Sequence, residues 1–401
     1  MFSIHKNPNM LFGALQSFFW SAMCLTCSFL ALYLESRGYD KEQIGQLFAI
    51  SALSLMLGQY VWGAYCYKHA WLSHKHIILF NFCIAIVCNF LFFYISSPFW
   101  VLILLFSIFT FTLSSMAPMI DAWTMFRKLD TPQMNYGLTR GMGSVAYALI
   151  VIGFGYIFRY LDIQYIFIFS SIFIFLGIIV TVRIHRGRPE NSFIVSQIAG
   201  IGAAKSLLIN KRFMIFILSI FFVFMAYMSN LTFYGLLIKE LGGSSREFGQ
   251  GFFIATFFQL PVMLLTVWLL KKYSAHNLLL FAFLCLLINT LTLTQADSLV
   301  VAILSQVFVS ISFGIFIPVS INYLTQIVRQ SEVTVGIMVM NAITFGLSGM
   351  IGNTLGGMVS QRLGLFVMYE VNAYLMLVGL LLFAGSSLFL KPLLIKPLTK
   401  P

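Results

Sequence analysis

Long apolar runs, separated by short polar segments, follow one another along nearly the whole chain. A helix needs about 20 apolar residues to cross the hydrocarbon core of a bilayer, and twelve runs approach or exceed that length. Backbone polar groups inside lipid must be paired within their own segment, so such runs must be helices. The pattern therefore predicts an all-α membrane protein with twelve transmembrane helices. The twelve runs are Met10–Leu34, Ile44–Tyr67, Ile77–Ile95, Phe99–Phe126, Arg140–Phe158, Tyr165–Val182, Phe213–Ile238, Phe248–Leu270, Leu278–Gln295, Leu299–Val328, Val333–Gln361 and Leu363–Leu390.

The runs fall into two groups of six, separated by the longest polar interruption of the chain, from Arg183 to Arg212. Several features recur at matching places in the two groups. Gly38, Gly45 and Gln46 in the first group correspond to Gly242, Gly249 and Gln250 in the second, with identical internal spacing. Pro118 likewise corresponds to Pro318. Such matches indicate a duplicated six-helix unit, as in membrane folds built from parallel repeats with a binding cavity between the halves. We expect an N-terminal six-helix bundle in residues 1–185, a cytoplasmic linker in 186–212 and a C-terminal bundle in 213–401.

Composition excludes a soluble domain, because hydrophobic residues make up 60% of the chain and charged residues only 9%, against ~25% in soluble proteins. The net charge of +12 would suit a nucleic-acid partner, but its distribution indicates a membrane instead. If the N-terminus is cytoplasmic, eighteen of the 24 lysines and arginines fall on the cytoplasmic side. By the positive-inside rule both termini are then cytoplasmic, in a plasma membrane such as the bacterial inner membrane. No nucleic-acid partner is expected.

Cysteine and histidine give no sign of a disulfide framework, a metal site or a cofactor. All six cysteines lie in or beside the apolar runs, and all six histidines lie in loops predicted to be cytoplasmic or at their edges. The sequence also lacks the constellations that a membrane enzyme would need, such as a His-Glu-x-x-His zinc helix or a serine–histidine pair. We expect no metal, no cofactor and no enzyme activity.

Asp121 and Arg140 are the most informative charged residues. Asp121 lies inside the fourth apolar run and Arg140 at the entrance of the fifth, whereas Glu370 lies near the outer end of the twelfth. A carboxylate near the middle of a bilayer costs roughly 2.5–3.5 kcal/mol even on the lenient insertion scale, so it usually faces a partner or a water-filled cavity. Asp121 and Arg140 would relieve each other's desolvation and could hold a polar solute. Alternatively, Asp121 caps a loop near the cytoplasmic surface and Arg140 extends toward lipid phosphates.

Uncharged polar residues inside the runs are further candidates for a binding cavity. They are Gln16, Asn230, Gln259, Asn289, Asn322 and Asn341. Each of them could equally form a hydrogen bond between two helices, so the sequence leaves both roles open.

Three segments resemble the lactose-permease-like branch of the major facilitator superfamily, and within it the group of 3-phenylpropionate permeases and nucleoside symporters. They are the loop from Gly38 to Gly45, the stretch from Pro118 to Gly143, and the glycine ladder from Gly346 to Gly357, which Arg362-Leu363-Gly364 follows. The resemblance covers essentially the whole chain. It implies the major facilitator fold, with two six-helix bundles and both termini cytoplasmic.

The resemblance also implies roles for particular residues. In that family a carboxylate and an arginine at the matching positions help to bind substrate, which implies this role for Asp121 and Arg140. Tyr147 follows Arg140 by seven residues, where lactose permease places an aromatic ring against the sugar. The other substrate-binding residues that we expect are Asn230, Gln259, Asn289 and Asn341.

The sequence departs from the family pattern at positions that carry charge in related symporters. The signature between the second and third spans lacks its aspartate, with Tyr67 in that place, and Gln259 stands where a glutamate is frequent. Asn289 and Ser310 take the places of a frequent arginine and a frequent histidine. These changes are mutually consistent, because losing one member of a buried charge pair would leave the other uncompensated. Asp121 remains as the expected proton-coupling residue.

These observations predict a secondary transporter that moves a small polar organic solute (a sugar, a nucleoside or an aromatic acid) by alternating access. We expect proton co-transport through Asp121 and a monomeric protein. An uncoupled facilitator and a transport-dead sensor on the same scaffold are the alternatives, because the neutral residues of the second half cannot exchange a proton.

Overall fold

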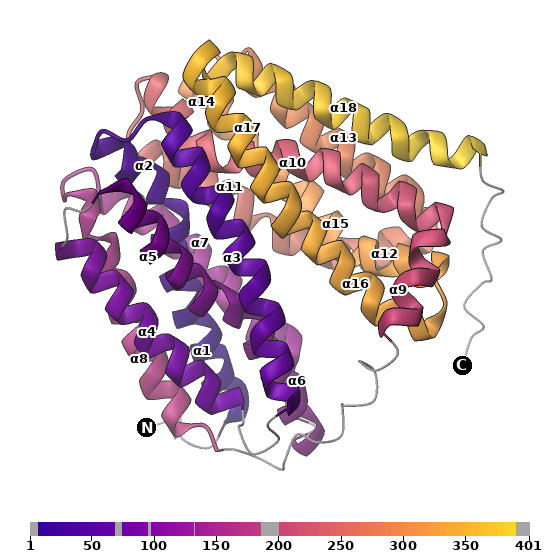
Figure 1. The fold of residues 1–401 in the computed structure, drawn as a ribbon, viewed down its shortest axis with the longest axis horizontal. Coiled ribbons are helices and arrows are strands. Elements are labelled where there is room, and N and C mark those ends of the chain that lie inside the picture. The colour runs from indigo at the N-terminus through magenta and orange to yellow at the C-terminus, as the bar shows by residue number, and fades with distance from the viewer. Residues whose placement is uncertain (1–6, 69–73, 95–97, 132, 186–199, 390–401) are drawn as a thin grey trace.

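The computed structural model describes residues 7–68, 74–94, 98–131, 133–185 and 200–389. The regular elements in these ranges are all helices, and twelve helical segments are long and apolar enough to cross a membrane. The prediction of an all-α membrane protein with twelve transmembrane helices is confirmed. In Figure 1 the first six spans lie together as one bundle, and the last six lie beside it as a second bundle.

The N-terminal bundle contains spans 1 to 6, two of which are interrupted. The elements of spans 1 to 3 are α1 (Pro8–Met23), a π-helical turn (Cys24–Ser28), α2 (Leu30–Ser36), α3 (Lys41–Lys68) and α4 (His74–Tyr94). Spans 4 to 6 consist of α5 (Phe99–Thr112), a 3-10 turn (Ser114–Met116), α6 (Ala117–Asp130), α7 (Tyr136–Ile157), a 3-10 turn (Ile163–Tyr165) and α8 (Ile166–Arg183).

The C-terminal bundle contains spans 7 to 12, and α9 (Gly200–Ile209) precedes it within the segment expected to be a linker. Spans 7 to 9 consist of α10 (Lys211–Glu240), α11 (Ser245–Phe257), α12 (Gln259–Lys272) and α13 (Ala275–Thr294). Spans 10 to 12 consist of α14 (Leu299–Leu304), α15 (Gln306–Ile327), a 3-10 turn (Gln330–Glu332), α16 (Val333–Asn341), a π-helical turn (Ala342–Leu347), α17 (Ser348–Leu363) and α18 (Leu365–Phe389).

Two interruptions follow from proline. Span 4 breaks just before Pro118 and span 8 just before Pro261. Proline lacks the N–H that a helix interior needs, and its ring collides with the carbonyl group four residues earlier, so the helix is disrupted there. Asp121 and Gln259 lie within three residues of these prolines. Two residues that the sequence marked as candidates therefore lie beside irregular backbone.

The two bundles meet on the side of the membrane that carries the loops after α2 and α10, which we call the distal side. There α3 crosses α17 at Gly45 and Gly357, and α7 crosses α11 at Gly155 and Gly249. A Cβ atom on Gly45 would lie 2.8 Å from the Cα of Gly357, and one on Gly249 would lie 3.2 Å from the Cα of Gly155. Backbones can approach this closely because glycine has no side chain. The repeat seen in the sequence thus appears as two equivalent crossings.

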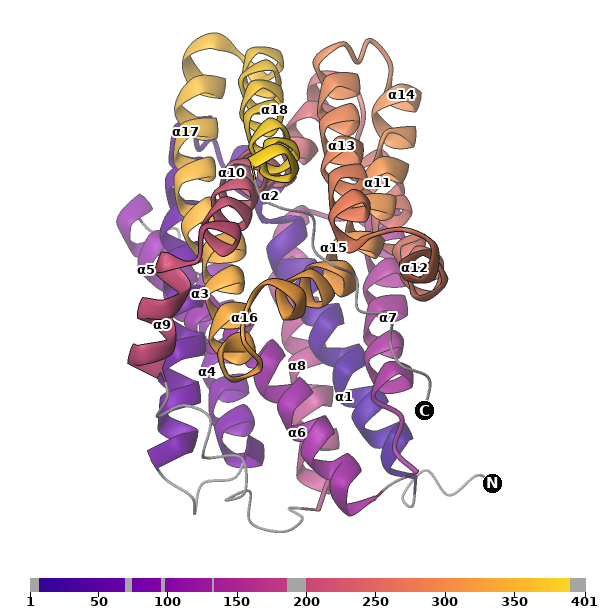
Figure 2. The ribbon, with the colours of Figure 1, turned by 90° about the vertical axis from the view of Figure 1, so that its right-hand side faces the viewer.

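Charged side chains join the bundles on the same side. Lys239 Nζ donates a hydrogen bond to Glu35 Oε2 at 2.9 Å, and Lys41 Nζ lies 3.6 Å from Glu240 Oε2. In Figures 1 and 2 the ribbons of the two bundles diverge from the distal side toward the start of α1. The structure therefore has its distal side closed.

Candidate functional site

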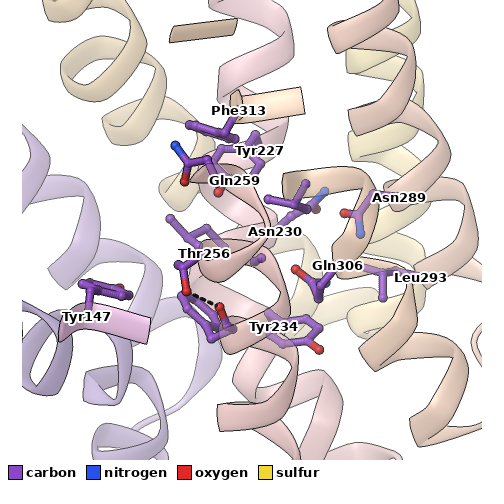
Figure 3. A pocket seen from close by; sticks show the side chains of 14 residues that line it. Tyr147, Tyr227, Asn230, Tyr234, Thr256, Gln259, Asn289, Leu293, Gln306 and Phe313 are labelled. Atoms are coloured by element: carbon purple, nitrogen blue, oxygen red, sulfur yellow. Dashed lines mark hydrogen bonds between the residues drawn. The ribbon is translucent and has the colours of Figure 1, made fainter. Parts of the chain in front are cut away.

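A cavity of about 190 Å³ lies in the C-terminal bundle and reaches the N-terminal bundle at Tyr147. Figure 3 shows Tyr147 across the cavity from Asn289 and Leu293. The aromatic residues of the lining are Tyr147, Tyr227, Tyr234, Phe252 and Phe313, and its carboxamides are Asn230, Gln259, Asn289 and Gln306. None of the described residues in this lining carries a formal charge. Such a lining suits a solute that has ring faces and neutral hydrogen-bonding groups.

Tyr147 connects this cavity with the N-terminal bundle. Its hydroxyl lies 2.5 Å from Ser28 Oγ, in the π-helical turn of span 1. Its ring meets the ring of Trp20 edge to face, with the ring centres 6.3 Å apart. The aromatic wall of the cavity therefore rests on α1.

Asp121 and Arg140 lie behind this wall and form the ion pair that the sequence predicted. Arg140 Nε is 3.9 Å from Asp121 Oδ1, and the two side chains are 31% and 30% exposed, respectively. The same carboxylate oxygen accepts a hydrogen bond from Gln16 Nε2 at 2.7 Å. The pair does not line the 190 Å³ cavity itself. The contacts from the pair to the cavity run through the Trp20 ring, which Arg140 covers, and then through the Tyr147 ring.

The local sequence explains the place of Arg140. Asn135 caps α7, because its Oδ1 accepts a hydrogen bond from the backbone N–H of Leu138 at 3.1 Å. The helix therefore begins four residues before Arg140, and Arg140 lies in its second turn. The guanidinium carbon stands 4.3 Å from the centre of the Trp20 ring, and Nη1 donates to Ser144 Oγ at 3.2 Å. In this structure Arg140 extends into the protein toward α1 and Asp121.

The carboxamides of the C-terminal bundle divide into two kinds. Asn230 is engaged at both ends, since it donates to Thr290 Oγ1 and accepts from Asn372 Nδ2, both at 2.8 Å. Asn289 Nδ2 donates to the carbonyl and the hydroxyl of Ser305, at 3.0 and 3.1 Å. Asn230 and Asn289 thus form hydrogen bonds between helices, which is one of the two roles that the sequence left open.

Gln259 and Gln306 are of the second kind. No protein hydrogen bond engages either side-chain amide within the described residues, and both amides line the cavity. Gln306 is only 6% exposed as a residue, and it lines the cavity. A bound solute would supply the missing partner. Gln259 and Gln306 are therefore the polar groups best placed to recognise the solute.

Asn341 takes no part in the cavity, although the sequence made it a candidate. It ends α16, is exposed and is absent from the lining. Conversely, Trp20 and Gln306 were not among the candidates. Gln306 follows Ser305 near the start of the tenth run, and this polar pair was the available signal. Nothing in the sequence marks Trp20 apart from its spacing of four residues from Gln16, which places the two on one helix face.

Comparisons with known proteins agree with this architecture. The family described as MFS_1 like matches residues 13–371. The chain is 23% identical over 385 residues to the uncharacterized transporter YwbF of Bacillus subtilis (strain 168), covering 94% of this chain and 92% of that one. It is 24% identical over 271 residues to the maltose permease of Geobacillus stearothermophilus, covering 67% of each.

Among solved structures, a mutant of the nucleoside transporter NupG superposes with a TM-score of 0.83 at 14% identity. The match covers 95% of this chain and 100% of that chain, so the two share a fold. The chain therefore belongs to the MFS_1 like family and is a multi-pass membrane transporter of the major facilitator type, not an enzyme.

Proposed function

We propose that the protein is a proton symporter for a small, uncharged, ring-shaped polar solute, such as a sugar or a nucleoside. The observation that carries the proposal is the place of Tyr147. This residue lines the cavity on one side and packs on the other against Trp20, whose ring holds the guanidinium of Arg140. A neutral solute site and a charged pair are thus joined by two aromatic rings.

The cavity lining supports an uncharged solute. An aromatic acid, the third class that the sequence allowed, would need a cation for its carboxylate, and the lining provides none. Arg140 already faces Asp121 and the Trp20 ring. The similarity to a maltose permease and to a nucleoside transporter supports sugars and nucleosides. Tyr147, Asn230, Gln259, Asn289 and Gln306 would surround such a solute, with direct hydrogen bonds from the two glutamines.

Asp121 is the proposed proton-coupling residue, and Arg140 is its counter-charge. The carboxylate lies inside a span and is partly accessible, as a site that exchanges a proton with water must be. One proton that enters with the solute supplies about 2.3 kcal/mol for each 100 mV of membrane potential. At 1.4 kcal/mol for each tenfold change, this sustains a solute concentration ratio of roughly 40.

We further propose that the protein works as a monomer in the plasma membrane, with both termini cytoplasmic. The bundles of residues 1–185 and 213–401 would rock against each other around the site between them, as in other parallel-repeat transporters. In this orientation the closed distal side faces outward, so the described state would release or accept solute on the cytoplasmic side.

Uptake into proteoliposomes tests the proposal. Radiolabelled maltose, D-xylose and uridine are offered to the purified protein with and without an inward proton gradient. We expect at least one of them to accumulate only with the gradient. Equal uptake without the gradient would instead favour an uncoupled facilitator, the runner-up that the neutral Gln259, Asn289 and Ser310 suggest. Absence of uptake and of binding for a wider panel of sugars and nucleosides would favour a sensor.

A further inference from the structure

The orientation of the Gln16 carboxamide follows from its two neighbours. The indole Nε1–H of Trp20 lies 3.0 Å from Gln16 Oε1, and an indole N–H can only donate, so it must face the amide oxygen. The amide nitrogen is thereby directed at Asp121 Oδ1, 2.7 Å away. Gln16 is only 1% exposed, so water does not compete for it. With Trp20 in this place, Gln16 stabilises the ionised form of Asp121.

Turning the same amide by 180° would reverse this preference. The amide oxygen would then face Asp121, where it can accept a hydrogen bond from a protonated carboxyl group and repels an ionised one. The Trp20 N–H opposes this second orientation, because it would meet the NH₂ group of Gln16. The position of the Trp20 N–H therefore determines whether the Gln16 amide stabilises the ionised or the protonated form of Asp121.

Trp20 also contacts a residue that lines the cavity. Its ring touches that of Tyr147, which lines the cavity. Trp20 also packs against α7 at Gly143, one helical turn before Tyr147, since a Cβ atom on Gly143 would lie 2.6 Å from Trp20 Cδ1 and 3.2 Å from the carbonyl oxygen of Gln16. A solute that presses on Tyr147 therefore acts on Trp20, and through it on the Gln16 amide.

We infer that Trp20 couples solute binding to protonation of Asp121 by controlling the orientation of the Gln16 amide. The inference rests on the proposed function and adds a positioning role for Trp20 and Gln16. A solute that displaces Tyr147 withdraws the indole N–H, the amide turns, and Asp121 takes up a proton from water on the open side. By thermodynamic linkage, protonation of Asp121 favours solute binding to the same extent.

Other charged or titratable groups also lie near Asp121. Arg140 and the hydroxyl group of Tyr136, both on α7, face the carboxylate. Helix α1 contains no acidic or basic residue between Pro8 and Met23. On α4, which packs against α6, the His74 ring lies on Phe126, with ring centres 5.3 Å apart. The Gln16 amide is thus the uncharged group beside Asp121 that can change its orientation.

Infrared difference spectroscopy tests this without a known solute, because it detects the carboxyl stretch of a protonated aspartate. The full-length protein is titrated in lipid nanodiscs, and Asp121→Asn identifies the band. Trp20→Phe keeps an aromatic face for Arg140 and Tyr147 but removes the N–H. We expect the Asp121 band in Trp20→Phe to reach half intensity about one pH unit higher than in wild type, a tenfold gain in proton affinity.

Two further variants separate the switch from a general disturbance. Gln16→Leu should shift the band in the same direction, and the double variant should shift it no further, because both changes act through one amide. Gln16→Leu also serves as the test if Trp20→Phe does not fold. Trp62→Phe is the matched control, since it removes an indole hydrogen bond of 3.2 Å to the Phe111 carbonyl in the same bundle, and it should titrate as wild type.

Each of three results overturns a defined part of the account. A band at the wild-type midpoint in both Trp20→Phe and Gln16→Leu contradicts the switch, and so does a double variant whose shift equals the sum of the single shifts. If no titrating band disappears in Asp121→Asn, the proposed proton site itself is wrong, whatever the two other variants do.

Discussion

The two sides of the candidate site satisfy their polar groups in different ways. On the N-terminal side, Asp121 and Arg140 are paired and held by Gln16 and Trp20. On the C-terminal side the lining is uncharged, and the Gln306 amide has no hydrogen-bond partner within the part of the chain that the structure describes. A half-buried charge is stabilised by a counter-charge within the protein, whereas an amide that lines a cavity can bind a ligand. From this difference we propose that one bundle handles the proton and the other recognises the solute.

The largest expected effect comes from removing one member of the Asp121–Arg140 ion pair. Arg140→Leu leaves Asp121 without its counter-charge, which costs roughly 3 kcal/mol, the lower end of the range for buried pairs, because both side chains are about 30% exposed. We expect a lower thermal unfolding midpoint and no accumulation of solute. Adding Asp121→Asn should restore much of the stability. Arg159→Leu, which removes an arginine near the surface tyrosine Tyr160, is the control, and an equal loss there would contradict the assignment.

A second, smaller effect concerns the closed distal side that both bundles share. In Gly155→Leu the side chain has no room, because a Cβ atom would lie 2.7 Å from the Ser245 carbonyl oxygen. The distal side should then stay open, and spin labels at Tyr160 and Asp297 should move apart. Gly153→Leu on the same helix is the control, since no described residue outside its own helix turn comes within 4 Å of its Cβ position. Unchanged label distances in Gly155→Leu would exclude the crossing as a gate.

Substitutions of the glutamines on the uncharged C-terminal side should change the affinity for solute more than the stability of the protein. A hydrogen bond to a solute contributes about 0.5–1.5 kcal/mol, so Gln306→Leu and Gln259→Leu should each raise the KM for the transported solute roughly 2- to 12-fold. Asn289→Leu should instead lower the thermal unfolding midpoint, since its amide binds Ser305. KM values and melting curves of the three variants check this division. The opposite pattern would show that Asn289 recognises the solute.

The smallest effect is expected at the surface ion pair of the distal side. Lys239 and Glu35 are 54% and 31% exposed, and such pairs contribute about 0–1 kcal/mol. Glu35→Gln should therefore leave uptake close to the wild-type rate and lower the melting temperature only slightly, most visibly at low salt. A large loss of uptake in that variant would mean that the pair controls closure.

The fold was predictable because the bilayer imposes it. A run such as Phe213–Ile238 must be helical in lipid whatever it packs against, and the structure places α10 over Lys211–Glu240. The pairing of Asp121 with Arg140 was predictable for a related reason, since two opposite charges in adjacent spans are costly apart. Backbone pairing in lipid constrains each span by itself, and charge pairing constrains two spans that follow each other in the sequence.

The details of the site were less predictable, because they depend on which helix faces which. Asn230 and Asn341 looked alike in the sequence, yet one is held between Thr290 and Asn372 and the other is exposed. Trp20 was not foreseen at all, since its place depends on the close approach of α1 to Gly143 of α7. Hydropathy reports depth in the membrane, and it does not report rotation about the helix axis.

The division of labour between the bundles is tested most directly by Asp121→Asn in proteoliposomes. The measurement compares exchange of labelled for unlabelled solute with net accumulation under an inward proton gradient, for a solute that the wild type accumulates. We expect exchange to continue near the wild-type rate while accumulation is lost. Accumulation at the wild-type level in Asp121→Asn would contradict it, because the proton would then be carried elsewhere.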